Sequence, residues 1–139
     1  MQTFPFKDAA TIQLISFKFN FNDTDTNYNL GVPIKENKLN YNKITKYLSL
    51  SDKEISALIH ILFQYKPTGG ISSHNCYSPN HGIVFMNKKN QIIEYIELCF
   101  ECQISQNYTD KSHWEINCSN QWELLESFFR ERNFSVSSY

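Results

Sequence analysis

Polar and apolar residues alternate along the first segment of the chain, which begins at Ile12. One face of this segment is apolar throughout and carries Ile15, Phe17, Phe19 and Phe21. A period of two is typical of a β-strand with one buried face. We therefore predict a half-buried strand over residues 12–21. Residues 22–42 are rich in Asn, Asp, Gly and Pro, which favour turns, and so they predict a long loop.

The spacing of apolar residues changes to three and four after Ser51. Ser51 and Glu54 have the spacing of a capping box, in which each side chain binds the backbone amide of the other residue. The apolar residues of this segment form one helical stripe, made of Ile55, Leu58, Ile59, Leu62 and Phe63. The pattern predicts a helix of about fifteen residues that stops before Pro67. A short strand over residues 44–48 is expected to precede it.

Two apolar segments, residues 82–87 and residues 91–101, flank a polar turn at residues 88–90. Apolar segments joined by such a turn indicate a β-hairpin. Both faces of the second segment are largely apolar, which is typical of a central strand. A further short strand is predicted over residues 113–117. The carboxylates of the hairpin alternate with apolar residues and predict a solvated sheet face: Glu94, Glu97 and Glu101.

The end of the chain has a second helical pattern. Asn120 and Glu123 again have the spacing of a capping box. One face of the segment is apolar and consists of Trp122, Leu125, Phe128 and Phe129. Arg130 and Arg132 follow where the helix dipole is negative, which stabilises a helix end. We therefore predict a closing helix.

The order of these elements is strand, loop, helix, hairpin, strand and helix. This order predicts an α+β fold, in which two helices cover one face of an antiparallel sheet made of the central hairpin, about residues 82–101, and the N-terminal strand. Of the 139 residues, 41% are hydrophobic and 15% are aromatic, which suffices for a globular core. We expect a single domain over residues 1–139.

The charge of the chain is nearly balanced, with 13 basic and 14 acidic residues and a net charge of −1. This balance argues against nucleic acid as a main partner, because binding to phosphates needs a basic surface. No apolar stretch approaches the roughly 20 residues that cross a bilayer, so no membrane partner is expected. The first segment also lacks the apolar run of a secretory signal, which favours a cytoplasmic protein. Removal of a leader would instead indicate a periplasmic or exported protein.

Four potential metal ligands lie at the open end of the predicted hairpin. Cys76 and His81 precede or begin its first strand, and Cys99 and Cys102 end its second strand. Antiparallel pairing around a turn near Lys89 places His81 opposite position 97 and Cys76 opposite position 102. Three thiolates and one imidazole suit a tetrahedral zinc ion. One structural zinc, held by these four residues, is therefore a candidate cofactor.

Other chemistry is open to the same residues. Free cysteine is among the most buried residue types, so these thiols can simply pack in the core. Cys99 and Cys102 have the spacing of a redox pair, although no helical pattern follows to activate a thiolate. Cys76 could act as a nucleophile with His81 or His74 as its base and Glu97 to orient that base, but no oxyanion-hole motif accompanies them.

The segment from Cys76 to Phe85 reads Cys-Tyr-Ser-Pro-Asn-His-Gly-Ile-Val-Phe, and the second hairpin strand ends in Cys-Phe-Glu-Cys at residues 99–102. These motifs resemble the hairpin of a group of small bacterial proteins that carry a CYxPxHGIxF pattern followed by CFxC. The resemblance covers about residues 48–103 and implies no particular activity. It implies that five residues act as one unit: Cys76, Pro79, His81, Cys99 and Cys102.

Three tyrosines lie in or beside the Asn-rich loop, where few buried positions are expected: Tyr28, Tyr41 and Tyr47. Exposed tyrosines are frequent anchors of protein interfaces. The sequence therefore favours a non-enzymatic protein-binding domain, such as an immunity protein or inhibitor that neutralises a partner protein. We expect a monomer or a small homo-oligomer. The alternatives are a zinc- or thiol-dependent enzyme centred on the cysteines and His81, and a zinc-stabilised structural module.

Overall fold

The structure, a computed structural model, describes residues 3–19, 34–64, 77–112, 114–116 and 118–136. Five strands form an antiparallel sheet in the order β4, β1, β5, β6, β7. Their bounds are β1 (Thr11–Phe17), β4 (Ile44–Ser49), β5 (His81–Met86), β6 (Ile92–Cys99) and β7 (Ile104–Asn107). The other elements are β2 (Ile34–Lys35), β3 (Lys38–Leu39), η1 (Tyr41–Lys43), α1 (Asp52–Ile59), η2 (His60–Gln64) and α2 (Ser119–Glu131).

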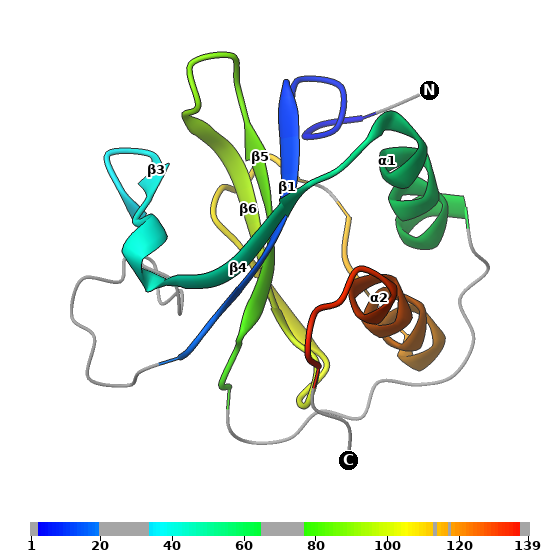
Figure 1. The fold of residues 1–139 in the computed structure, drawn as a ribbon. Coiled ribbons are helices and arrows are strands. Elements are labelled where there is room, and N and C mark those ends of the chain that lie inside the picture. Colours follow the sequence, from blue (N-terminus) through cyan, green and yellow to red (C-terminus); the bar gives the residue numbers. More distant parts are fainter. Residues whose placement is uncertain (1–2, 20–33, 65–76, 113, 117, 137–139) are drawn as a thin grey trace.

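Both helices lie on one face of the sheet, and the β2–β3 hairpin lies on the other side (Figure 1). The larger hydrophobic cluster fills the space between the sheet and the helices. A smaller cluster lies on the opposite face, where Ile34 and Leu39 of the hairpin pack on Val84 and Tyr95. The predicted α+β fold, with an antiparallel sheet covered by two helices, is confirmed.

Strand β1 is buried on both faces, whereas the sequence predicted one buried face. Ile12 and Leu14 belong to the cluster under the helices, and Ile15 and Phe17 belong to the cluster under the β2–β3 hairpin. The strand ends at Phe17, so Phe19 lies beyond it. Layers on both sides of the sheet explain the difference, because the helices cover one face and the β2–β3 hairpin packs on the other (Figure 1).

Helix α1 begins with the capping box that the sequence predicts. Ser51 Oγ accepts a hydrogen bond from the Glu54 N–H at 3.2 Å, and Glu54 Oε1 accepts one from the Ser51 N–H at 3.0 Å. The helical segment continues through the π-helical turn η2 to Gln64. Leu58 and Leu62 of the predicted stripe are buried under the sheet, but Phe63 at its end is 37% exposed.

Strands β5 and β6 form the predicted hairpin, and β6 is central because it also pairs with β7. At the open end of the hairpin, the observed pairing of the two strands differs by one residue from the predicted pairing. His81 lies opposite Leu98 and not opposite position 97, because a β-bulge between Phe85 and Met86 shifts the pairing.

The last strand is not where the sequence placed it. Residues 114–116 form no strand, and residues 113 and 117 lie outside the described residues. The edge strand is β7, whose four residues are all half-buried. A short, mostly polar edge strand shows no clear alternation, and its backbone pairing with β6 decides the structure.

Helix α2 has the predicted apolar face but a different start. Its N-cap is Cys118, whose side chain makes no capping hydrogen bond, so the predicted capping box of Asn120 and Glu123 is wrong. Asn120 Oδ1 instead accepts a hydrogen bond from the Cys118 thiol at 2.7 Å. At the other end, the Arg132 guanidinium forms an ion pair with Glu54 of α1 at 2.6 Å. This ion pair ties the two helices together.

Candidate functional site

Cys99 and Cys102 are joined by a disulfide. Strand β6 ends at Cys99, and the turn that follows brings the two Cα atoms to 5.5 Å. The Cys102 N–H donates to Cys99 Sγ at 3.3 Å, and both residues are fully buried. Cys76 lies outside the described residues, and Cys118 is a buried free thiol at the start of α2. The pair thus forms the disulfide state of the predicted redox motif.

His81 lies at the start of β5 and faces the helices. Its ring packs edge-to-face against Phe100 and Phe129, at centroid distances of 5.2 and 5.5 Å. Its Nε2 lies 2.9 Å from the Ser135 carbonyl oxygen, which can only accept a hydrogen bond. Nε2 therefore carries the proton, and Nδ1 of the neutral ring is an acceptor. Burial lowers the pKa of His81, and the bond to Ser135 opposes this shift in part.

The structure describes three of the four predicted zinc ligands, His81, Cys99 and Cys102. His81 is paired with Leu98, so Cys99, the next residue on β6, points to the opposite face of the sheet. Within the ranges that the structure describes, no three His, Cys, Asp or Glu side chains are grouped to hold a metal ion. The structure brings Cys99 and Cys102 together and leaves His81 apart from them.

A buried carboxylate that the sequence assigned to a solvated face lies on β6. Glu97 is fully buried, and it accepts hydrogen bonds from Tyr77 at 2.8 Å and from Tyr95 at 2.9 Å. Gly82 lies opposite Glu97, and a Cβ at Gly82 would overlap the Tyr95 ring. Because glycine has no side chain, the Tyr95 ring can lie against the backbone of Gly82. We call Tyr77, Gly82, Tyr95 and Glu97 the tyrosine–carboxylate cluster.

Both tyrosines of this cluster are held in the neutral form. Burial raises the pKa of Tyr77 and of Tyr95, and the nearby Glu97 carboxylate raises both further. Each hydroxyl is thus a hydrogen-bond donor to Glu97 at neutral pH. The residue pattern did not reveal this cluster, because the predicted pairing placed His81 opposite position 97, whereas the structure places Gly82 there.

Glu94 is also fully buried, contrary to the predicted solvated face. Its carboxylate accepts hydrogen bonds from the Thr109 hydroxyl at 2.6 Å and the Ser112 hydroxyl at 2.7 Å. It also accepts one from the Thr109 N–H at 3.0 Å. These bonds fix the segment that follows β7, so Glu94 has a structural role.

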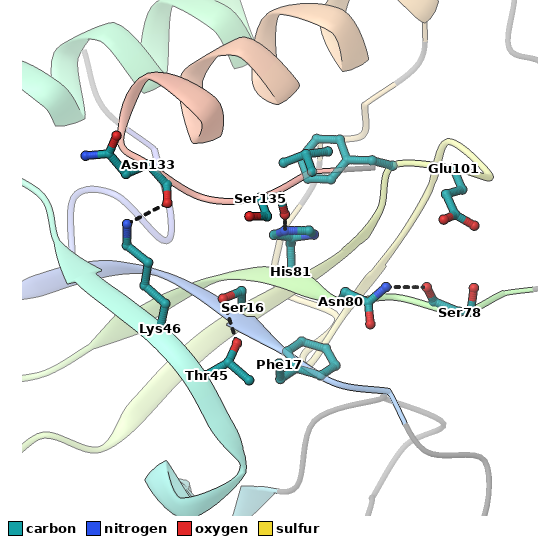
Figure 2. Close-up of a pocket in the computed structure, with 12 residues that line it drawn as sticks. Ser16, Phe17, Thr45, Lys46, Ser78, Asn80, His81, Glu101, Asn133 and Ser135 are labelled. Atoms are coloured by element: carbon teal, nitrogen blue, oxygen red, sulfur yellow. Dashed lines mark hydrogen bonds between the residues drawn. The ribbon is translucent and has the colours of Figure 1, made fainter. Parts of the chain in front are cut away.

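A pocket of about 330 Å³ opens beside His81, between the end of the sheet and the segment after α2. Figure 2 shows His81 near its centre, with Ser135 on one side and Asn80 and Ser16 on the other. Its lining is mostly polar, and consists of Ser16, Phe17, Thr45, Lys46, Ser78, Asn80, His81, Phe100, Glu101, Asn133, Ser135 and Val136.

Lys46 closes one side of this pocket. Its ammonium group donates to the carbonyl oxygens of Arg132 and Asn133 at 2.9 and 2.8 Å, and it lies 4.6 Å from the centre of the Phe134 ring. These carbonyls are at the negative end of α2, so the charge of Lys46 is compensated there.

Tyr41 and Tyr47 form an exposed aromatic pair at the edge of the sheet. Tyr41 is 43% exposed and Tyr47 is 57% exposed, and their ring centroids are 5.0 Å apart. The Tyr41 hydroxyl donates to Gln13 Oε1 at 3.0 Å, which fixes its ring. Partial burial raises the pKa of Tyr41. The third predicted contact residue, Tyr28, lies outside the described residues.

Strand β4, which carries Tyr47, is an edge strand of the sheet. The Leu50 N–H donates to the Ile12 carbonyl oxygen at 2.9 Å, so the even-numbered residues of this part of the chain point their backbone groups at β1. The backbone N–H and C=O groups of Tyr47 and Ser49 therefore point away from β1, at the open edge of the sheet. No other strand in the described part of the chain pairs with this side of β4.

No helix in the described ranges is long and apolar enough to cross a bilayer. Comparison with protein-family models, with curated proteins and with solved structures finds no match for this chain.

Proposed function

We propose that this chain is a non-enzymatic protein-binding domain, of the immunity or inhibitor type, which neutralises a partner protein. The observation that carries the proposal is the exposed pair of Tyr41 and Tyr47 on the edge strand β4. We call Tyr41, Tyr47 and the outer backbone edge of β4 the tyrosine edge.

The tyrosine edge has the chemistry of a protein interface. Tyrosine offers a large apolar ring and a hydroxyl at a low entropic cost, because it has few rotatable bonds. The Tyr41 ring is already fixed by Gln13 and by Tyr47, so little order has to be gained on binding. The two rings thus form a preorganised contact surface.

The backbone of β4 supplies a second mode of contact. An extended segment of a partner can add to an exposed sheet edge through main-chain hydrogen bonds. Lys18 follows Phe17, Lys43 precedes its pairing partner Ile44, and both lysines are exposed, so this end of β4 carries positive charge. We therefore expect a partner segment that is extended and carries acidic residues.

Affinity capture from native lysate, followed by quantitative mass spectrometry, tests the proposal. The bait is the full chain, compared with a Tyr41→Ala/Tyr47→Ala variant. The matched control is Glu123→Ala/Ser127→Ala, which changes two exposed residues of α2, on the helix side of the sheet. We expect a protein that the native chain and the control retain and the tyrosine variant loses.

Calorimetry with that purified protein then measures the affinity. Loss of both rings should weaken binding by at least about tenfold, the effect of about 1.4 kcal/mol. Equal affinity of the tyrosine variant would refute a role for the tyrosine edge, and the lack of any specifically retained protein would count against a binding function.

The backbone contribution has its own test. Ser49→Pro removes an outward N–H, whereas Ser49→Ala keeps it and removes only the hydroxyl that accepts from Gln13. If the partner adds a strand to β4, the proline variant binds more weakly than the alanine variant. Equal binding of both variants would exclude strand addition at this position and leave the tyrosine contacts untouched.

A further inference from the structure

The pocket beside His81 does not include Tyr41 or Tyr47, and it contains polar groups that make no hydrogen bond within the described part of the fold. The hydroxyls of Ser78 and Ser135 make no hydrogen bond to any residue that the structure describes, and neither does His81 Nδ1. The Ser16 and Thr45 hydroxyls bind each other at 2.9 Å, and each can accept one more bond. The pocket thus offers several donors and acceptors to a ligand.

One of these acceptors is Nδ1 of the neutral His81 ring. Its Nε2–H is committed to the Ser135 carbonyl, and the rings of Phe100 and Phe129 fix its orientation. Nδ1 is therefore a positioned acceptor on a ring that lines the pocket. A ligand that donates an O–H or N–H to Nδ1 would satisfy it, whereas a bare anion would not.

The charges of the pocket favour a ligand without net charge. Lys46 and Glu101 are the one cation and the one anion among the lining residues, given that His81 is neutral. Lys46 already binds two carbonyl oxygens at the end of α2. The pocket therefore has no excess of either charge to attract an ion.

The remaining lining is apolar and consists of two aromatic rings and Val136. Phe17 and Phe100 belong to the pocket together with the serine and asparagine side chains. A ligand that has hydroxyl groups along its edge and C–H groups on its faces satisfies both kinds of lining. A volume of about 330 Å³ suits a molecule of the size of a single sugar ring, since ligand pockets range from about 300 to 1,000 Å³.

We propose that this pocket binds a small neutral polyhydroxylated molecule, such as a monosaccharide or cyclitol, with one ligand hydroxyl donating to His81 Nδ1. This assignment does not depend on the protein-binding function. The same chain can hold the small molecule in the pocket and contact a protein with Tyr41 and Tyr47, because neither tyrosine lines the pocket.

Nuclear magnetic resonance of the full chain with ¹⁵N-labelled histidine tests the proposal, because the Nδ1 resonance of a neutral ring responds to an accepted hydrogen bond. The probes are glucose, ribose and myo-inositol, with inorganic phosphate and Zn²⁺ as charged competitors. We expect a saturable shift of His81 Nδ1 with at least one neutral probe. His60, an exposed histidine at the end of α1, is the internal control and should not shift.

The variant His81→Gln separates binding from folding. Its amide can still donate to the Ser135 carbonyl, but it lacks the imidazole acceptor. We expect at least a tenfold loss of affinity for the probe, with an unchanged amide spectrum in the rest of the sheet. The proposal is overturned if no neutral probe shifts Nδ1, if only phosphate or Zn²⁺ does, or if His81→Gln binds the probe as the native chain does.

Discussion

Gly82 is the residue through which the tyrosine–carboxylate cluster can be disturbed most directly. A Cβ at Gly82 would overlap the Tyr95 ring, so the ring has to move. The Tyr95 hydroxyl would then leave Glu97, a buried carboxylate. We expect Gly82→Ala to lower the free energy of unfolding by about 2–4 kcal/mol, through overpacking and the lost hydrogen bond. Urea unfolding measures this change.

The control for this prediction is the same substitution in a Tyr95→Leu background. A smaller side chain leaves room for the new methyl group, so Gly82→Ala should cost much less there. A double-mutant cycle gives the coupling energy between the two positions. An equal cost in both backgrounds would contradict the contact.

The oxidation state of Cys99 and Cys102 separates the chemical alternatives for these residues. Because they form a disulfide, we expect the denatured, unreduced chain to have a mass lower by two hydrogens than the fully reduced chain. Alkylation before reduction should leave Cys99 and Cys102 unmodified, and alkylation after reduction should modify both. Peptide mapping identifies the modified residues.

Native mass spectrometry of the same sample, purified without a chelator, tests the zinc hypothesis. A disulfide and zinc ligation at Cys99 and Cys102 exclude each other, because zinc binds thiolates. A native mass with one zinc ion and free thiols on denaturation would therefore contradict the disulfide. That result would favour the alternatives built on Cys76, His81, Cys99 and Cys102, a zinc-dependent enzyme or a zinc-stabilised module.

At the scale of elements, the start of α1 should make stability depend on pH. The Ser51 N–H lowers the pKa of Glu54, and Arg132 of α2 lowers it further. The folded state therefore binds fewer protons than the unfolded state while this carboxyl titrates. Its contribution is complete above the unfolded pKa of 4.5 and is lost as the pH falls through the lower folded value.

We expect Glu54→Gln to lower the melting temperature at about pH 7, and we expect this loss to shrink as the pH falls below 4.5 and the native carboxyl takes up its proton. Ser51→Ala is the comparison, since it removes a capping bond to an uncharged backbone N–H and should cost about 1 kcal/mol. Melting curves of the native chain and of both variants across this pH range measure these differences. An equal loss for Glu54→Gln at both ends would show that its charge has no part in the stability.

The success of prediction from sequence varied among the elements for physical reasons. The capping box of α1 and the β5–β6 hairpin were predictable, because their signals lie within a few neighbouring residues. Strand β7 was not, because its pairing with β6 gives it structure without an apolar pattern. The capping box expected at Asn120 was wrong because Cys118 begins the helix.

The candidate site was less predictable than the fold. The sequence predicted that Tyr41 and Tyr47 are exposed residues of a protein interface. The structure finds both exposed and packed against each other, and their role in binding stays a prediction. It could not show that Glu97 is buried, because the two tyrosines that bind it are recognised only in three dimensions. Likewise, a bulge and strand alternation separate His81 from Cys99, and neither is visible in residue spacing.

At the scale of the whole molecule, the five-stranded sheet has one hydrophobic cluster on each of its two faces. Leu125 of α2 belongs to the cluster on the helix side, and Leu39 of β3 belongs to the cluster on the other face. Strands β1, β5 and β6 contribute buried residues to both clusters. The two faces should therefore unfold together, as expected of a single domain.

This cooperativity can be tested with Leu39→Ala, Leu125→Ala and the double variant. Each truncation removes buried methyl groups and should lower the free energy of unfolding by about 2–5 kcal/mol, with the fully buried Leu125 nearer the upper value. The two side chains belong to different clusters on opposite faces, so their costs should add to within about 0.5 kcal/mol.

Urea unfolding of all three variants should be followed by tryptophan fluorescence, which reports on Trp122 of α2 and on Trp114, both at the helix-side cluster, and by far-ultraviolet circular dichroism, which reports on the whole backbone. Coincident transitions are expected for every variant, because the sheet cannot lose one covering layer and keep the other face packed. If Leu39→Ala shifted the circular dichroism transition and left the fluorescence transition in place, the β2–β3 hairpin would be a separate unit that the sheet does not need.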